Sequence, residues 1–228
     1  MANSFSVIGT SIGKKVSMAL TGLFLCTFLV VHLVGNVALL SDDGGLAFNA
    51  YTDFMRSNML IRIMEIGLLV GFLGHIAFGY MVSFQNKGAR PKGYSNLSSQ
   101  AANGWFARTM KWTGTLILIF LVIHLKSFWF EFGFGDPQVT QYGDTAYKDM
   151  YMIVKSAFSN WWYVLFYVVT MLFMAFHLNH GVQSGFRSLG LSDTKYRKIL
   201  SSLGTVFAFV MGIGFALIPI LMYVKHAA

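Results

Sequence analysis

The chain has 228 residues, of which 55% are hydrophobic and only 11% are charged. This composition excludes an ordinary soluble domain, because the apolar residues gather in runs that are long enough to cross a hydrocarbon core of about 30 Å. The formal net charge of +8 does not indicate nucleic-acid binding, since most Lys and Arg lie outside the apolar runs and mainly on one side of them. Cys26 is the one cysteine, which excludes a disulfide framework and a thiolate metal site.

Five apolar runs are each long enough, at about 20 residues, to cross a bilayer as a helix. They cover residues 16–40, 59–84, 110–131, 161–186 and 202–224. A segment that crosses lipid must satisfy its own backbone hydrogen bonds, which a helix does and an open strand does not. We therefore predict an all-α, multi-pass integral membrane protein, with five transmembrane helices in a bundle that forms a single domain over residues 1–228.

Lys and Arg are distributed unevenly between the two sides of this predicted bundle. Eleven of them lie before the first run, between the second and third, or between the fourth and fifth, whereas the opposite side has six together with seven acidic residues. Basic residues are enriched on the cytoplasmic side of membrane proteins. The asymmetry therefore predicts an N-terminus inside and a C-terminus outside, with an inner face suited to anionic lipid or a cytoplasmic partner.

The first and third runs contain two similar segments. MALTGLFLCTFLVVHL begins at Met18 and MKWTGTLILIFLVIHL begins at Met110, and eight of the sixteen positions are identical. The identical positions include a Thr-Gly pair near the start of each segment and a His-Leu pair at its end. The first and third spans are therefore expected to play equivalent parts.

Four of the predicted spans carry histidine at a depth where a polar side chain is costly and marks a candidate functional site. At a rise of 1.5 Å per residue, His32 and His124 lie toward the outside, because the first and third spans run outward. His75 in the second span, and His177 and His180 in the fourth, lie toward the inside. We therefore predict two pairs at two levels, His32 with His124 and His75 with a histidine of the fourth span.

Two histidines of the fourth span are candidates for the inner pair. The second span reads HIAFGYMVSF from His75 and the fourth reads HLNHGVQSGF from His177, and both have glycine four residues on and phenylalanine nine residues on. This weak internal repeat favours His177. His180 lies about one turn further along, and it stays open as an alternative ligand or as a contact for a haem propionate or quinone.

The surroundings of these histidines favour haem over a bare metal ion. Zinc and copper normally recruit additional Cys, Asp or Glu ligands, and none of these stands beside the histidines in the sequence. Haem needs only two axial nitrogens, because its porphyrin supplies the other four. Two b haems are therefore predicted, and small residues such as Gly22 and Gly114 would allow the close approach of helices around them.

Glu65 in the second span is a candidate for proton exchange with quinone. Arg62 lies three residues before it on one helical face, and the pair is near the predicted depth of the outer haem. Quinone chemistry moves protons with electrons, so a carboxyl at this depth is suited to it. The alternatives are a structural ion pair and an arginine that holds a haem propionate. Five tryptophans near span ends indicate an interfacial belt: Trp105, Trp112, Trp129, Trp161 and Trp162.

The segments MALTGLFLCTFLVVHLVGN, RIMEIGLLVGFLGHIAFGY, TGTLILIFLVIHL and FHLNHGVQSGFRSLG together resemble the cytochrome b558 subunit of succinate dehydrogenases and fumarate reductases. This family is the five-helix, di-haem membrane anchor, and the resemblance covers residues 12–224. It implies that His32 pairs with His124 and His75 with His177. Some members of the family place the fourth histidine directly before glycine, as His180 stands before Gly181, which keeps the alternative open.

The resemblance also implies the partners and the reaction. A flavoprotein subunit and an iron–sulfur subunit on the cytoplasmic side of the bacterial inner membrane would oxidise succinate, or reduce fumarate, as part of electron transport and the tricarboxylic acid cycle. This chain would pass electrons between the iron–sulfur subunit and quinone, with menaquinone expected because the quinone site would lie outside. The chain itself has no flavin-binding glycine motif and no cysteine cluster.

Two other functions are compatible with the same residues. One is the cytochrome b subunit of a different quinol dehydrogenase, which would have other soluble partners. The other is a transporter or channel in which the histidines relay protons and no cofactor is bound. Haem content separates the transporter from the two cytochromes, and co-purification of a flavoprotein separates the cytochromes from each other.

Overall fold

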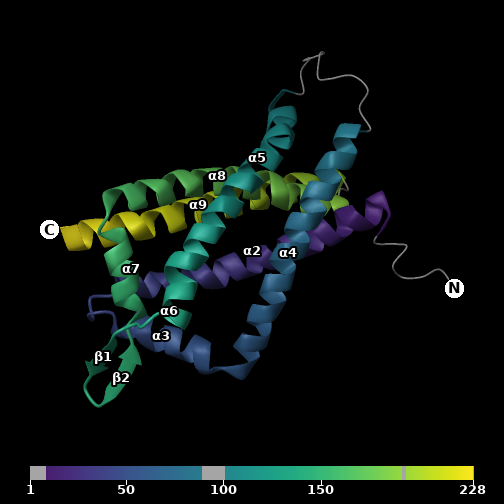
Figure 1. The fold of residues 1–228 in the computed structure, drawn as a ribbon. Helices are drawn as coiled ribbons and strands as arrows, with labels where there is room; N and C mark the ends of the chain where they lie inside the picture. Colours follow the sequence, from purple (N-terminus) through teal and green to yellow (C-terminus); the bar gives the residue numbers. More distant parts are fainter. Residues whose placement is uncertain (1–8, 89–100, 192–193, 228) are drawn as a thin grey trace. The chain divides into compact units, whose positions relative to one another are not determined.

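The computed structural model describes residues 9–88, 101–191 and 194–227, without the side chains of 86–88, 101–108, 194 and 227. The chain is mostly helical, and five helices in these ranges are long and apolar enough to cross a membrane (Figure 1). Their spans are Ser11–Leu40, Met59–Gln85, Thr109–Phe134, Trp161–Ser188 and Lys195–His226. The prediction of five helices that are long and apolar enough to cross a bilayer is confirmed.

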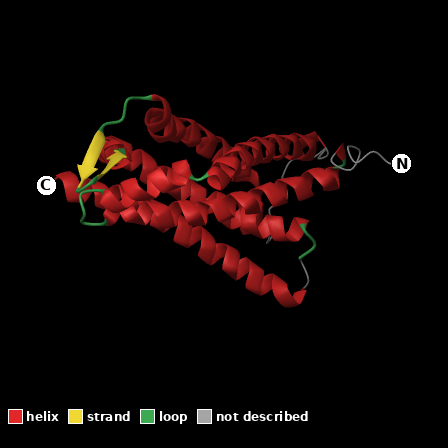
Figure 2. Ribbon diagram, turned by 90° about the horizontal axis from the view of Figure 1, so that it is seen from below, coloured by secondary structure: helices red, strands yellow, loops and turns green. Residues whose placement is uncertain are grey.

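The described elements follow one another along the chain as long helices with shorter elements between some of them. They are α2 (Ser11–Val37), the 3-10 turn η1 (Ala38–Leu40), α3 (Leu46–Ser57), α4 (Met59–Gly88), α5 (Ala101–His124), the π-helix η2 (Leu125–Phe130), α6 (Glu131–Phe134), β1 (Val139–Tyr142), β2 (Thr145–Lys148), α7 (Met150–Phe158), α8 (Trp161–Ser188) and α9 (Thr194–Ala227). Figure 2 shows the antiparallel hairpin of β1 and β2 in yellow.

The chain divides into two compact units, and every long helix contributes residues to both. Unit 1 comprises Met1–Phe28, Gly67–Thr115 and Ala175–Phe209, and unit 2 comprises Leu29–Ile66, Leu116–Met174 and Val210–Ala228. Each unit therefore contains one of the predicted histidine pairs, His75 with His177 in unit 1 and His32 with His124 in unit 2. The assignment of residues 1–228 to a single domain stays a prediction.

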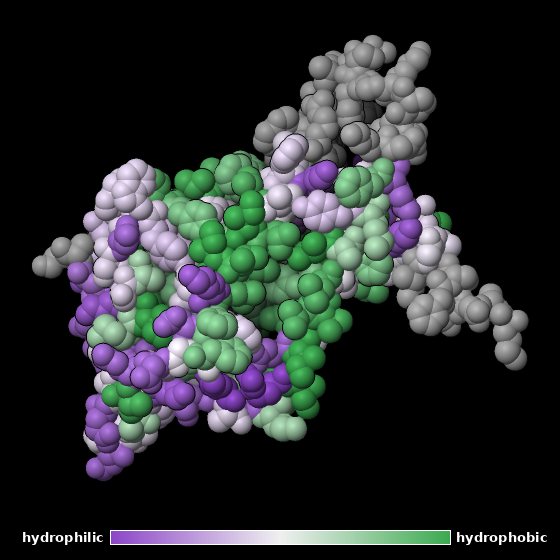
Figure 3. Space-filling view, viewed as in Figure 1, coloured by the Kyte–Doolittle hydropathy of each residue, from purple (hydrophilic) through white to green (hydrophobic). Residues whose placement is uncertain are grey.

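The long helices expose apolar side chains more than they bury them. The most apolar window of the Met59–Gln85 span is 0% buried, and that of Thr109–Phe134 is 6% buried. Figure 3 shows hydrophobic residues over much of the visible surface of these helices, whereas hydrophilic residues gather around the β-hairpin. Water penalises exposed apolar surface by about 25 cal/mol per Å², and lipid tails do not. These helices identify a multi-pass membrane protein.

Unit 2 also contains the short elements outside the spans. β1 pairs antiparallel with β2, and α3 contacts both β2 and α7 (Figure 1). The buried Asn49 and Asp149 side chains join these elements, because Asn49 Nδ2 donates to Asp149 Oδ1 at 3.0 Å and the Tyr151 backbone N–H donates to Asn49 Oδ1 at 2.9 Å. Asp149 also accepts from the Met152 backbone N–H at 2.8 Å and thereby caps α7.

Polar side chains join α8 and α9 within unit 1. Gln183 Nε2 donates to Asn179 Oδ1 at 2.7 Å, and Thr205 Oγ1 donates to the same oxygen at 2.9 Å. Ser201 Oγ donates to Gln183 Oε1 at 3.1 Å. Inside an apolar span these hydrogen bonds satisfy groups that water would otherwise satisfy, and they hold neighbouring helices together.

The structure adds elements that the apolar runs did not predict. The fifth span begins at Lys195 rather than at residue 202, because the helical hydrogen bonds of α9 continue through its polar first turns. α3 forms a helix of 12 residues in a connection to which no element was assigned. Five residues named in the sequence analysis or counted toward the predicted orientation lie outside the described side chains: Lys87, Arg90, Lys92, Trp105 and Arg108. The orientation stays a prediction.

Candidate functional site

Two histidine rings face each other in unit 1. His75 on α4 and His177 on α8 have ring centres 6.4 Å apart and ring planes inclined at 75°. Two imidazoles that bind one metal ion from opposite sides, at about 2 Å each, have ring centres about 6 Å apart. The structure thus brings together the pair that the span depths and the internal repeat favoured, with a spacing suited to a shared metal.

The repeated threonines lie against these two rings. Thr21 Oγ1 on α2 is 3.4 Å from His75 Nδ1, and Thr113 Oγ1 on α5 is 3.3 Å from His177 Nδ1. Both threonines come from the same position of the repeated segment. The histidine of each even-numbered span is therefore contacted by the threonine of the span before it.

The repeated glycines leave room for the same rings. A Cβ added at Gly22 would lie 3.0 Å from Cε1 of His75, and one added at Gly114 would lie 3.3 Å from Cε1 of His177. These separations are shorter than the 3.5–4.0 Å at which carbon atoms pack best. The Thr-Gly pair thus forms a seat for an imidazole, in which glycine provides the space and threonine a polar contact at Nδ1.

The second pair lies in unit 2 and has a different surrounding. The His32 and His124 rings are 5.8 Å apart at 87°. Phe215 lies 5.6 Å from the His32 ring, and Phe120 stacks on the His124 ring at 5.5 Å. The Asn36 amide donates to the His32 carbonyl oxygen at 2.7 Å and lies 3.4 Å from Nδ1 of that ring. Aromatic rings thus line much of this site.

A chain of hydroxyl groups leads away from His124. The Tyr167 hydroxyl lies 3.1 Å from His124 Nδ1 and 3.3 Å from the Tyr163 hydroxyl, which donates to Ser127 Oγ at 2.8 Å. Ser127 is in the π-helix η2, which begins directly after His124. Short π-helical stretches inside α-helices occur frequently at functional sites, and this one places Ser127 within reach of Tyr163.

His180 occupies a different position from His177. It lies on α8 three residues beyond His177 and is partly buried, but the ring that faces His75 is that of His177. Gly114 and Thr113 likewise contact His177. The geometry of unit 1 therefore favours His177 as the partner of His75.

Glu65 and Arg62 are an ion pair on α4, and a third residue joins them. Trp129 Nε1 on η2 donates to Glu65 Oε1 at 2.7 Å, while Arg62 contacts the other carboxylate oxygen. A shallow apolar hollow lies beside this group and is lined by Leu125, Lys126, Trp129 and Phe130. Trp129 had been interpreted only as a residue of the interfacial belt, and the structure gives it a contact with the candidate acid.

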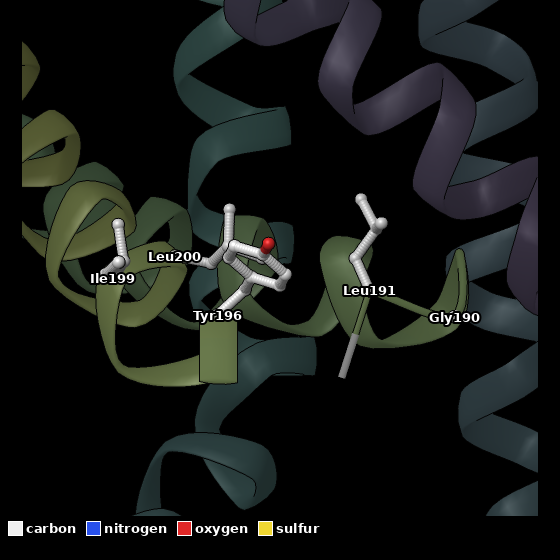
Figure 4. Close-up of a pocket in the computed structure, with 5 residues that line it drawn as sticks. All are labelled: Gly190, Leu191, Tyr196, Ile199 and Leu200. Atoms are coloured by element: carbon white, nitrogen blue, oxygen red, sulfur yellow. The ribbon is translucent and has the colours of Figure 1, made fainter. Parts of the chain in front are cut away.

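A second shallow hollow lies in unit 1, where α8 ends and α9 begins (Figure 4). It is lined by Gly190, Leu191, Tyr196, Ile199 and Leu200, and Figure 4 shows the Tyr196 ring lying between Leu191 and Leu200. Among the described residues that line it, Tyr196 alone has a polar side-chain group, its hydroxyl. None of the histidines or acids predicted to be functional lines this hollow, which therefore adds nothing to the candidate site.

The two pairs were tested against the kinds of metal site that they could form. Among the described residues, no three or more His, Cys, Asp or Glu side chains gather as they would around an ion held by the protein alone. A pair of imidazoles is too few for a structural zinc site, which takes four protein ligands. It is the number that an axially ligated haem takes from the protein, so the residues present fit haem.

Comparisons with protein-family models, with curated proteins and with solved structures found no match to this chain.

Several residues of the site were not predicted from the sequence. Thr21 and Thr113 were visible as identical positions of the repeat, but the repeat alone did not show that they contact the histidine of the next span. Tyr167 had no sequence signal, because an aromatic residue in an apolar run looks like any packing residue. The Thr-Gly pair of the repeat is the sequence signal that singles out these two threonines, and the contact with the next span is visible only in the structure.

Proposed function

We propose that this chain is the membrane anchor and electron-transfer subunit of a bacterial succinate:quinone oxidoreductase, with two b haems. His32 with His124 and His75 with His177 would be the axial ligands. The observation that supports this most directly is that four histidines from four different spans form two facing pairs, at 5.8 and 6.4 Å. Burying polar side chains inside membrane spans is energetically unfavourable. A ligand bound by both histidines of each pair would offset that free energy.

Each residue of the site has a part in this function. When bound, haem supplies a one-electron redox centre. The four imidazoles would hold the two haems, and the Thr-Gly seats would position those of His75 and His177. Phe120 and Phe215, which lie against the imidazoles of unit 2, exclude water, and the polarity of such a surrounding influences the potential.

Electrons and protons would meet at the quinone. Reduction of a quinone takes up two protons with two electrons, so the site needs a group that transfers protons. Glu65 is the candidate, because its carboxylate is held by Trp129 and Arg62 beside the hollow on η2. Menaquinone is the proposed substrate, since the distribution of Lys and Arg assigns this end of the helices to the outer side of the inner membrane.

The reaction of the dicarboxylate would take place on partner subunits. The sequence has no flavin-binding glycine motif and no cysteine cluster, so a flavoprotein and an iron–sulfur protein would supply these functions on the cytoplasmic side. The eleven basic residues assigned to that side are suited to docking them or to contacting anionic lipid.

The test is the haem content of the complex purified from membranes, measured as the reduced pyridine adduct per chain. We expect two b haems, with one lost in H32A or H124A and the other lost in H75A or H177A. H180A is the matched control, since it removes a partly buried histidine of the same span and should leave both haems in place. A co-purifying flavoprotein with succinate-to-quinone activity is expected in the same preparation.

Other results would refute particular parts of the proposal. Well-folded protein without haem would refute the electron-transfer function and favour a proton relay or transport function. Two haems without a flavoprotein partner would assign the chain to another quinol dehydrogenase. Loss of the inner haem in H180A but not in H177A would show that the ligand assignment is wrong.

A further inference from the structure

The hydrogen bonds of Thr21 and Thr113 restrict the protonation of the two rings in unit 1. A threonine hydroxyl has one hydrogen to donate and two lone pairs that accept. Thr21 Oγ1 donates to backbone carbonyl oxygens of its own helix, those of Ser17 at 2.8 Å and Met18 at 3.1 Å. Its one hydrogen already has two carbonyl acceptors on its own helix, so toward His75 Nδ1 the oxygen is available as an acceptor.

The second copy of the repeat has the same arrangement. Thr113 Oγ1 donates to the carbonyl oxygens of Thr109 at 3.2 Å and Met110 at 3.1 Å. It is 6% exposed, so water does not replace these partners. Its oxygen is likewise available as an acceptor for Nδ1 of His177, which lies 3.3 Å away.

A backbone carbonyl supports the same conclusion for His75. The Met18 carbonyl oxygen is 3.3 Å from His75 Nδ1, and a carbonyl oxygen has no hydrogen to donate. Both neighbours of this nitrogen are therefore acceptors, so Nδ1 carries the proton. In a neutral imidazole the other nitrogen, Nε2, is then the unprotonated one that binds a metal.

We propose that Thr21 and Thr113 are positioning residues that accept the Nδ1–H of His75 and His177 and so present Nε2 of both rings to one haem iron. This inference rests on the proposed function, because it concerns the same ligands. An acceptor at Nδ1 raises the basicity of a ligating histidine, which stabilises ferric over ferrous iron. The two threonines would therefore lower the midpoint potential of the haem in unit 1.

The experiment compares T21V and T113V with T21S and T113S in the purified complex, by redox titration and by the low-spin ferric EPR spectrum. Valine keeps the shape and removes the acceptor, whereas serine keeps the hydroxyl. T113V should raise the potential of the haem that is lost in H75A by about a tenfold change in relative ferric affinity, or about 59 mV. T21V should raise it by less, because the Met18 carbonyl oxygen still accepts from Nδ1 of His75. The serine variants should stay close to the wild type.

T170V is the matched control. Thr170 is also a buried threonine in a span, 6% exposed, and its Oγ1 donates to the Phe166 carbonyl oxygen on its own helix at 2.8 Å. Its replacement should change neither potential nor spectrum, so a shift seen only in T21V and T113V is specific to the seats.

The possible results separate this inference from the proposed function. A wild-type complex without haem refutes the proposed function. Two haems in the wild type, with unchanged potentials in both valine variants or with equal shifts in valine and serine variants, overturn the assignment of the hydroxyls. If a valine variant loses the haem, retention in the matching serine variant supports the inference, and loss in both overturns it.

Discussion

Gly22 provides the sharpest test of the site geometry, because a single methyl group there meets the His75 ring. In G22A the added carbon would lie 3.0 Å from Cε1 and 3.3 Å from Nδ1 of His75. Carbon atoms pack best at 3.5–4.0 Å, so the ring must move by about 0.5–1 Å. The same substitution favours the helix by about 1 kcal/mol, since alanine is the better helix former. Folding of α2 and occupancy of the site should therefore respond in opposite directions.

The size of the effect follows from the cost of overpacking. Forcing an extra methyl into a close-packed site costs about 1–3 kcal/mol, which corresponds to a loss of about 5- to 150-fold in haem affinity. The assay is haem per chain in complexes assembled with limiting haem, together with the thermal stability of the complex. G22A should retain thermal stability and lose one haem, the one that is also lost in H75A.

Two further glycines give a graded series. A Cβ at Gly114 would lie 3.3 Å from the His177 ring, and a Cβ at Gly79 would meet nothing within 4 Å among the described residues. G114A should therefore have an intermediate effect and G79A none. Equal haem contents in G22A and G79A would refute the reasoning, because the methyl at residue 22 would then not be in contact with a ligand.

Three other substitutions probe unit 2. Y167F removes the hydroxyl that lies 3.1 Å from His124 Nδ1. In a redox titration it should change the relative ferric affinity of the haem that is lost in H124A by up to about tenfold, and hence its midpoint potential, while the potential of the other haem stays unchanged. E65Q should slow succinate-to-quinone turnover by about 100-fold or more, while haem content and succinate-to-dye turnover stay at the wild-type level. If E65Q and the wild type reduce quinone at the same rate, the Glu65–Trp129 contact serves stability alone. D149A removes the N-cap of α7 and a buried hydrogen-bond partner of Asn49. It should lower the free energy of unfolding by about 2–4 kcal/mol, which is measured as a lower Tm. An unchanged Tm would contradict the role assigned to this carboxylate.

The amino-acid sequence determined the membrane class and the depth of each histidine, and it left His177 and His180 as alternatives for the inner pair. An apolar run of about 20 residues in lipid has few alternatives to a helix, since its backbone must satisfy itself. Along a helix the rise per residue is constant, so the position of His32, His75, His124 and His177 in the runs predicts their depth. The structure then places the rings of these residues in facing pairs.

The elements between the spans could not be predicted in the same way. α3 meets the β1–β2 hairpin where Asn49 donates to Tyr142 and Asp149, which lie 93 and 100 positions further along the chain. Hydrophobic periodicity reports local structure, and it carries no information about a contact of that kind.

The tertiary structure decided which groups contact the ligands. Thr21 and Thr113 belong to one pattern in the sequence, but only the approach of α2 to α4 and of α5 to α8 brings their hydroxyls to His75 and His177. In the same way, the packing of α8 against α5 brings the Tyr167 hydroxyl to Nδ1 of His124. The physical reason is that the depth of a residue follows from its position along its own helix. The group that its side chain contacts depends on which helix packs beside it, and that is set by the tertiary structure.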